Sequence, residues 1–151
     1  MSNRRIWLFV TLIILTITIV LLVTGSPILN VALDENESVP LGTFITWIGI
    51  ISLPCSIYWG LNDLRNPTER FYKYLAIVLR IILVLALLWM PICYLLAGNI
   101  SFSFSEKDTF QGGQLAMKWF WRFSYAMAIG PILLLIIYVV SLLLVKKRNK
   151  T

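Results

Sequence analysis

Histidine is absent from this chain of 151 residues, and carboxylates are scarce, with seven Asp and Glu in total. None of the seven lies inside a long apolar run. Metal centres draw their ligands from His, Cys and clustered carboxylates, and proton-coupled transport usually needs an intramembrane acid or His. The only two cysteines, Cys55 and Cys93, form no C-x-x-C motif. We therefore expect no metal, no cofactor and no enzymatic activity.

Charge is also low, because 13% of the residues are charged and 59% are hydrophobic, against about 25% and 45 to 50% in ordinary soluble domains. A soluble protein of this length cannot bury so much apolar surface, so the bilayer is its expected solvent. The chain is predicted to be an all-α integral membrane protein, a four-transmembrane-helix bundle that forms a single domain over residues 1–151. The four apolar runs that predict spans are residues 6–23, 41–61, 74–97 and 119–145.

The first run follows Arg4 and Arg5, as the core of a secretory signal would. Signal cores are usually about 7 to 15 residues long and precede a small-x-small cleavage site. This run is longer and ends in VTGSP. We expect a retained first helix rather than a cleaved signal.

The distribution of charge predicts how the chain is threaded. Four spans place the N-terminus, the loop 62–73 and the C-terminal tail on one side, where nine Lys and Arg face two acids. The loops 24–40 and 98–118, with the residues after them, carry three basic residues and five acids on the other side. By the positive-inside rule, both termini are expected in the cytoplasm. The net charge of +6 thus reflects topology, and nucleic acid is not an expected partner.

Apart from Arg122 in the aromatic lead-in 119–122 of the fourth run, Arg80 is the one charged residue inside an apolar run. It lies six residues beyond Tyr74, or roughly 9 Å along a helix. Helical side chains lean toward the N-terminus, so the guanidinium can reach the cytoplasmic headgroups. Alternatively, Arg80 pairs with Asp63 inside the bundle as an intramembrane polar site. The sequence leaves both interpretations open.

Small residues predict where helices approach one another in the second and fourth spans. Close approach allows the dispersion contacts and hydroxyl hydrogen bonds that hold helices together in lipid. The predicted helix-packing positions are Gly42, Thr46, Gly49, Ser56, Gly60, Ala126 and Gly130.

Proline interrupts three of the four spans, at Pro54, Pro91 and Pro131. Each lacks an N–H, so each should kink its helix and release the carbonyl four residues earlier. Released carbonyls can coordinate ions or polar substrates, but neighbouring helices more often satisfy them.

The second outer loop holds the main candidate for a partner-binding surface. Residues 100–105 read ISFSFS, an alternation that favours a short strand. The first outer loop also alternates near Leu29 to Asp34, so short strand-like outer loops are expected. An exposed strand edge suits a partner strand, and two basic residues follow four apart on the next helix. The predicted partner-binding residues are Ile100, Phe102, Phe104, Phe110, Lys118 and Arg122.

Three functions remain open. The first is a non-enzymatic subunit or partner-binding component of a larger membrane complex, with another membrane protein or a second copy as partner besides the lipid bilayer. The second is a small channel or transporter that uses the proline kinks and Arg80. A lipid-acting membrane enzyme ranks last, for want of a nucleophile with a base. The short basic tail and the lack of a bulky outer domain favour the plasma membrane, and a bacterial inner membrane over a eukaryotic membrane.

Overall fold

The computed structural model describes residues 3–33, 39–100 and 110–148, and these form helices joined by short connections. The expected all-α class is confirmed. Three helices are long and apolar enough to cross a membrane, or four spans result if the bent pair α4–α5 counts as one. The elements are α1 (Asn3–Thr24), η1 (Pro27–Asn30), α2 (Leu41–Gly60), α3 (Asn62–Arg65), α4 (Arg70–Leu87), α5 (Trp89–Ala97) and α6 (Gln114–Arg148).

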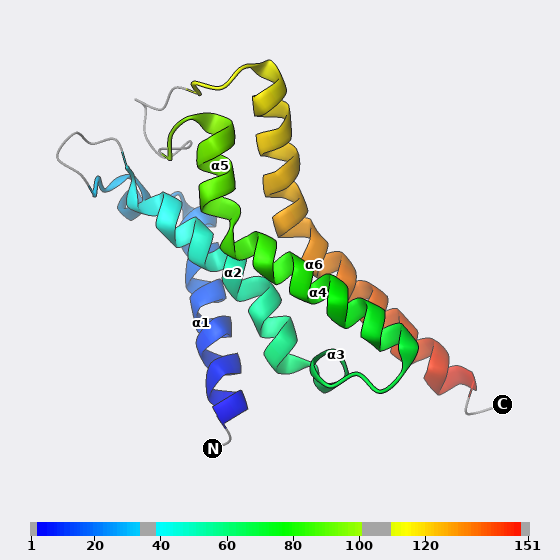
Figure 1. Ribbon diagram of the computed structural model, residues 1–151. Helices are drawn as coiled ribbons and strands as arrows, with labels where there is room; N and C mark the ends of the chain where they lie inside the picture. Colours follow the sequence, from blue (N-terminus) through cyan, green and yellow to red (C-terminus); the bar gives the residue numbers. More distant parts are fainter. Residues whose placement is uncertain (1–2, 34–38, 101–109, 149–151) are drawn as a thin grey trace.

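The helices run between two opposite ends of the molecule. Both chain termini and α3 lie at one of them, which we call the termini end (Figure 1). The start of α2, the end of α5 and the start of α6 lie at the other, which we call the loop end. Together α4 and α5 run from the termini end to the loop end, and α6 returns beside them.

The central helix is α2, which packs against α1, α4 and α6. Its sequence is apolar on all sides and rich in Gly, Ser and Thr, as suits a helix with neighbours around it. By contrast, α1 packs on α2 and η1 and buries only Thr11 and Thr18. Between Ile6 and Val23, most of the other side chains of α1 are apolar and exposed, as on a surface that faces lipid.

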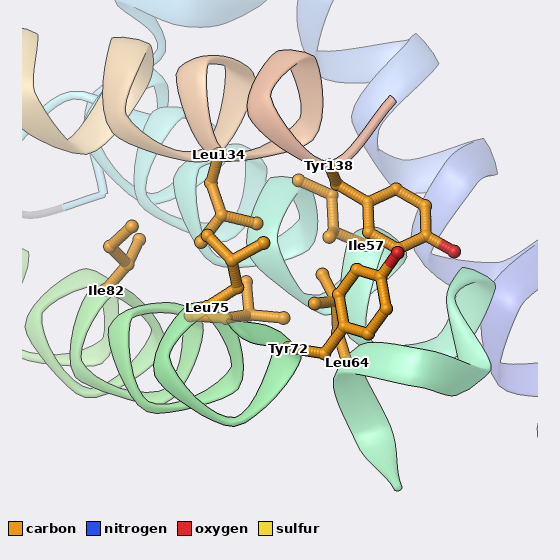
Figure 2. Close-up of a cluster of buried hydrophobic side chains, with 8 residues drawn as sticks. Ile57, Leu64, Tyr72, Leu75, Ile82, Leu134 and Tyr138 are labelled. Carbon is orange, nitrogen blue, oxygen red and sulfur yellow. The ribbon is translucent and has the colours of Figure 1, made fainter. Parts of the chain in front are cut away.

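Most of the buried apolar residues form two clusters, one toward each end. Figure 2 shows the termini-end cluster, where α2, α3, α4 and α6 meet. The loop-end cluster joins α4, α5 and α6. The termini-end cluster consists of Ile57, Leu64, Tyr72, Leu75, Leu79, Ile82, Leu134 and Tyr138. The loop-end cluster consists of Ala86, Trp89, Cys93, Ala97, Phe120 and Met127.

A sharp bend divides the third predicted span. The axes of α4 and α5 differ by 55°, and the break falls at Leu88, three residues before Pro91. Proline removes one backbone hydrogen bond and its ring crowds the preceding turn, so a bend at this position is expected. The other two prolines, Pro54 and Pro131, lie inside the continuous helices α2 and α6.

The connections at the loop end contain little regular structure. In the first, Ala32 and Pro40 form an isolated antiparallel bridge, flanked by hydrogen bonds from Leu33 N to Val39 O (2.9 Å) and from Leu41 N to Val31 O (2.8 Å). This bridge is the extent of the expected strand-like structure in the described residues. The segment 101–109, which holds most of ISFSFS, lies outside them.

Candidate functional site

At the termini end, Arg4 joins the start of α1 to the end of α2. Its Nε donates to the carbonyl of Trp59 at 2.8 Å, and its Nη2 donates to the carbonyl of Gly60 at 2.7 Å. The last carbonyls of a helix have no intrahelical partner and carry the negative end of the helix dipole. A guanidinium therefore forms a charge-assisted cap there, stronger than a neutral hydrogen bond.

Next to this cap, Asp63 joins α3 to α6. Its Oδ2 accepts a hydrogen bond of 2.8 Å from the hydroxyl of Tyr138. The Tyr138 ring lies 5.7 Å from the ring of Tyr72 on α4, and Figure 2 shows the two rings side by side. Ser141 donates to the Tyr138 carbonyl at 2.7 Å and lies 3.5 Å from the Tyr72 hydroxyl. These contacts link α3, α4 and α6 at one level.

The structure does not bring the two predicted members of the intramembrane polar site together. Asp63 is engaged with Tyr138, while Arg80 lies on the exposed face of α4. Ala76, which the sequence places beside Arg80 on the helix, is buried. Arg80 thus lies on the face of α4 away from the buried clusters. This position agrees with the interpretation in which its guanidinium reaches the lipid headgroups.

In the middle of the bundle, two tryptophans use their N–H groups to join helices. Trp47 on α2 donates to the carbonyls of Ala86 (3.1 Å) and Leu87 (3.2 Å). The Leu87 carbonyl is the one that Pro91 releases, so a neighbouring helix satisfies it. Trp89 donates to the hydroxyl of Ser124 at 3.2 Å, and Cys93 lies 3.8 Å from the same hydroxyl.

The predicted packing residues of α2 divide into several environments. A Cβ on Gly49 would collide with the side chain of Thr18, so α1 approaches α2 closely here, while a Cβ on Gly60 would meet Leu8 at an ordinary 3.7 Å. Gly42 and Ser56 are buried. The Thr46 hydroxyl oxygen is buried without a hydrogen-bond partner in the described part of the chain.

On α6 the two predicted packing residues differ. Gly130 faces α4, because a Cβ there would lie 3.6 Å from the Ile82 side chain. Ala126 is exposed, and its role in helix packing stays a prediction.

At the loop end, the base of the second outer loop is held against the bundle. The carbonyl of Ala97 accepts hydrogen bonds from Gln111 N (3.0 Å) and Gly112 N (3.2 Å). Gly98 closes α5 in a left-handed conformation (φ 82°) that favours glycine. Any Cβ on Gly112 would collide with the carbonyl of Leu96. The two ends of the loop are therefore fixed close together.

The predicted partner-binding residues divide between inner and outer positions. The carbonyl of Ile100 accepts a 2.7 Å hydrogen bond from buried Thr43, and Phe110 packs edge-on against Phe120 at 5.9 Å. These two anchor the loop. Lys118 is exposed, and the Arg122 guanidinium lies 5.4 Å from the Trp119 ring centroid. Phe102 and Phe104 lie outside the described residues.

Sequence reasoning missed Arg4, Trp47 and Tyr138 as bonding residues. The sequence did contain a clue to the role of Trp47. Because Pro91 has no N–H, the Leu87 carbonyl needs another donor. For Arg4, whose acceptors lie 55 and 56 residues along the chain, no local pattern names the partner.

The described residues contain no group of three or more His, Cys, Asp or Glu that could hold a metal, and both cysteines are free thiols. Comparison of the chain with protein-family models, curated proteins and solved structures finds no match. Its own residues are therefore the basis for any statement of function.

Proposed function

We propose that this chain is a small non-enzymatic integral membrane protein that acts as a subunit or partner-binding component of a larger membrane complex. The observation that carries the proposal is that polar side chains between the helices bond to other helices of the same chain. Asp63, Trp47, Trp89 and Arg4 are engaged in hydrogen bonds between the protein's own helices. Such groups hold a scaffold together and leave little for chemistry on a substrate.

The contact surface that we propose is the loop between the fixed positions Ile100 and Phe110, with Lys118 and Arg122 beside it. The residues between these two positions read SFSFSEKDT and lie outside the described part of the chain, while the residues at the base of the loop are hydrogen-bonded to one another. Two exposed cations on the adjoining helix suit acidic residues of a partner. The partner is another membrane protein, with a second copy of the chain as the other possibility.

The orientation belongs to the same proposal. With the termini end in the cytoplasm, nine basic residues lie inside and three lie outside. The proposed membrane is the plasma membrane, and a bacterial inner membrane in particular.

Co-purification in mild detergent tests this function. The wild-type chain is expected to retain a stoichiometric partner, and the double variant Phe102→Ser, Phe104→Ser is expected to lose it. The matched control is Ile28→Ser, Leu33→Ser, which alters two exposed apolar residues of the other outer connection. Equal retention by both variants would show that the contact surface is elsewhere, and a lone chain with no partner would count against a subunit role.

The small channel or transporter is the alternative, and the α4–α5 break is what favours it, because discontinuous helices build many transport sites. The Leu87 carbonyl released at this break is already bonded to Trp47, which weakens that case. Solute flux into liposomes that contain the purified chain alone distinguishes the two functions. A lipid-acting enzyme remains the weakest candidate.

A further inference from the structure

One exposed stripe of α4 carries two positive charges. Lys73, Ile77, Arg80, Val84 and Leu87 are all exposed. Lys73 and Arg80 are seven residues apart, so at 3.6 residues per turn they lie almost on one line, about 10 Å apart along the helix. Ile77 lies between them, and Val84 and Leu87 continue the stripe toward the loop end.

The chain's described acids do not neutralise these charges. The described residues contain two carboxylates, Asp63 and Glu69. Asp63 already accepts the Tyr138 hydroxyl, and Glu69 lies eleven residues before Arg80, or about 16 Å along the axis. Glu69 lies only one turn before Lys73, but among the described residues no ion pair joins these two side chains. No ion pair or hydrogen bond is attached to the Arg80 side chain in the described part of the chain. Its counter-charge must come from outside.

The position of the stripe in the bundle decides what can supply that charge. Lys73 lies near the start of α4, at the termini end. Arg80 lies deeper, but helical side chains lean toward the helix N-terminus, so its guanidinium is directed toward the level of Lys73. A phosphate group at the edge of the leaflet lies within reach of the Arg80 guanidinium, which binds phosphate through paired hydrogen bonds. Lys73, about 10 Å nearer the helix start, adds a second positive charge to the same headgroup region.

We propose that the Lys73–Arg80 stripe of α4 is a binding site for the headgroup of one anionic phospholipid in the leaflet at the termini end. Arg80 binds the phosphate, and Lys73 attracts the negative charge of the headgroup. The exposed side chains of Ile77, Val84 and Leu87 lie along an acyl chain of the same lipid. Charge complementarity selects an anionic lipid over a zwitterionic one, because a second cation adds attraction only to net negative charge.

Native mass spectrometry of the intact chain tests the site. Protein released from micelles with phosphatidylglycerol and phosphatidylcholine of equal chain length is expected to retain one phosphatidylglycerol. Arg80→Gln and Lys73→Gln are each expected to weaken retention about fivefold, and the double variant more, because each basic residue near an anionic surface adds a comparable attraction. Arg80→Lys, which keeps the charge, is expected to retain most of the binding.

The matched control is Arg65→Gln, which removes a charge at the same end but off the stripe, where Arg65 donates to Asn62 at 3.1 Å. It is expected to bind lipid like the wild type. Circular dichroism confirms that each variant keeps its helices. The proposal is overturned if Arg80→Gln retains phosphatidylglycerol fully, if phosphatidylcholine is retained equally, or if Arg80→Gln loses a co-purified protein while its lipid is unchanged.

Discussion

Single side-chain groups hold the helices together. In lipid, association of helices gains little from the hydrophobic effect, so close packing and interhelical hydrogen bonds decide it. Tyr138 is buried and reaches the half-buried carboxylate of Asp63, while Thr18 is buried against Gly49. Each contact depends on a single atom or group that a conservative substitution can remove or add.

Tyr138→Phe is expected to lower the free energy of unfolding by about 1 to 2 kcal/mol, because it leaves a carboxylate without its hydroxyl donor. Thermal unfolding in detergent, followed by circular dichroism, measures the loss. Tyr125→Phe on the same helix removes an exposed hydroxyl and is expected to change little. Equal effects of the two variants would mean that the Asp63 bond does not stabilise the fold.

Gly49→Ala is expected to destabilise the protein by about 1 to 3 kcal/mol, the range for overpacking a close contact. The added Cβ collides with the Cγ2 methyl of Thr18. Thr18→Ser removes that methyl and is expected to restore much of the stability in the double variant. Gly60→Ala is the comparison, because a Cβ there lies 3.7 Å from Leu8, an ordinary contact. An equal loss of stability in Gly60→Ala would show that replacing glycine, and not the collision with Thr18, destabilises the protein.

At the scale of whole elements, the paired bends of α4–α5 and α6 give the bundle its form. In Figure 1, α6 runs beside α5 near the loop end and beside α4 near the termini end. The indole N–H of Trp47 lies at the break and donates to the two carbonyls before Leu88. Trp47 thus joins the α4–α5 bend to α2, a helix that is not next to α4 or α5 in the sequence.

Trp47→Phe is expected to cost about 1 kcal/mol, because the Leu87 carbonyl loses its donor. Pro91→Ala restores an N–H that can donate to that carbonyl, so in the Pro91→Ala background Trp47→Phe is expected to cost less. A double-mutant cycle of unfolding free energies in detergent measures this coupling. Additive effects would show that Trp47 acts by packing alone.

The sequence predicted the helical spans because a membrane helix needs a long apolar run, and the length and composition of such a run are local properties. The described spans agree closely with residues 6–23 and 41–61, and the bend near Pro91 was expected from the missing N–H. Helix partners were harder to predict. Nothing near Asp63 in the sequence indicates that Tyr138, 75 residues away, rather than Arg80, supplies its hydrogen bond. The packing of α3 against α4 and α6 decides which side chain bonds to Asp63.

At the scale of the whole molecule, the start of α1, the end of α6 and α3 lie at one end, while the end of α1, the start of α2, the end of α5 and the start of α6 lie at the other. This common placement is what the charge count requires if each predicted span crosses the bilayer. Arg4, Arg5, Arg65 and Arg70 then lie at the same end as Lys73, because they stand at the start of α1, in α3 and at the start of α4.

In a variant without native cysteines, Asn149→Cys is expected to resist a membrane-impermeant thiol reagent in intact cells, and Asn30→Cys is expected to react. The positive-inside rule is the physical basis, because basic loops are retained in the cytoplasm. After the cells are opened, both positions are expected to react. Labelling of Asn149→Cys in intact cells would reverse the proposed orientation.

The cap that Arg4 places on α2 also sets an order for biogenesis. The acceptor at Trp59 is 55 residues downstream, so at about 5 to 20 residues per second the ribosome needs about 3 to 11 seconds to deliver it. During that interval α1 is a lone helix, and the hydroxyls of Thr11, Thr16 and Thr24 bond to its own carbonyls. Within the described residues, only Thr18 of the α1 threonines bonds outside the helix, to the Ile45 carbonyl of α2 at 3.4 Å. The nascent first helix therefore satisfies its other hydroxyls in lipid by itself, and the Arg4 cap closes the α1–α2 hairpin only once Gly60 has been made.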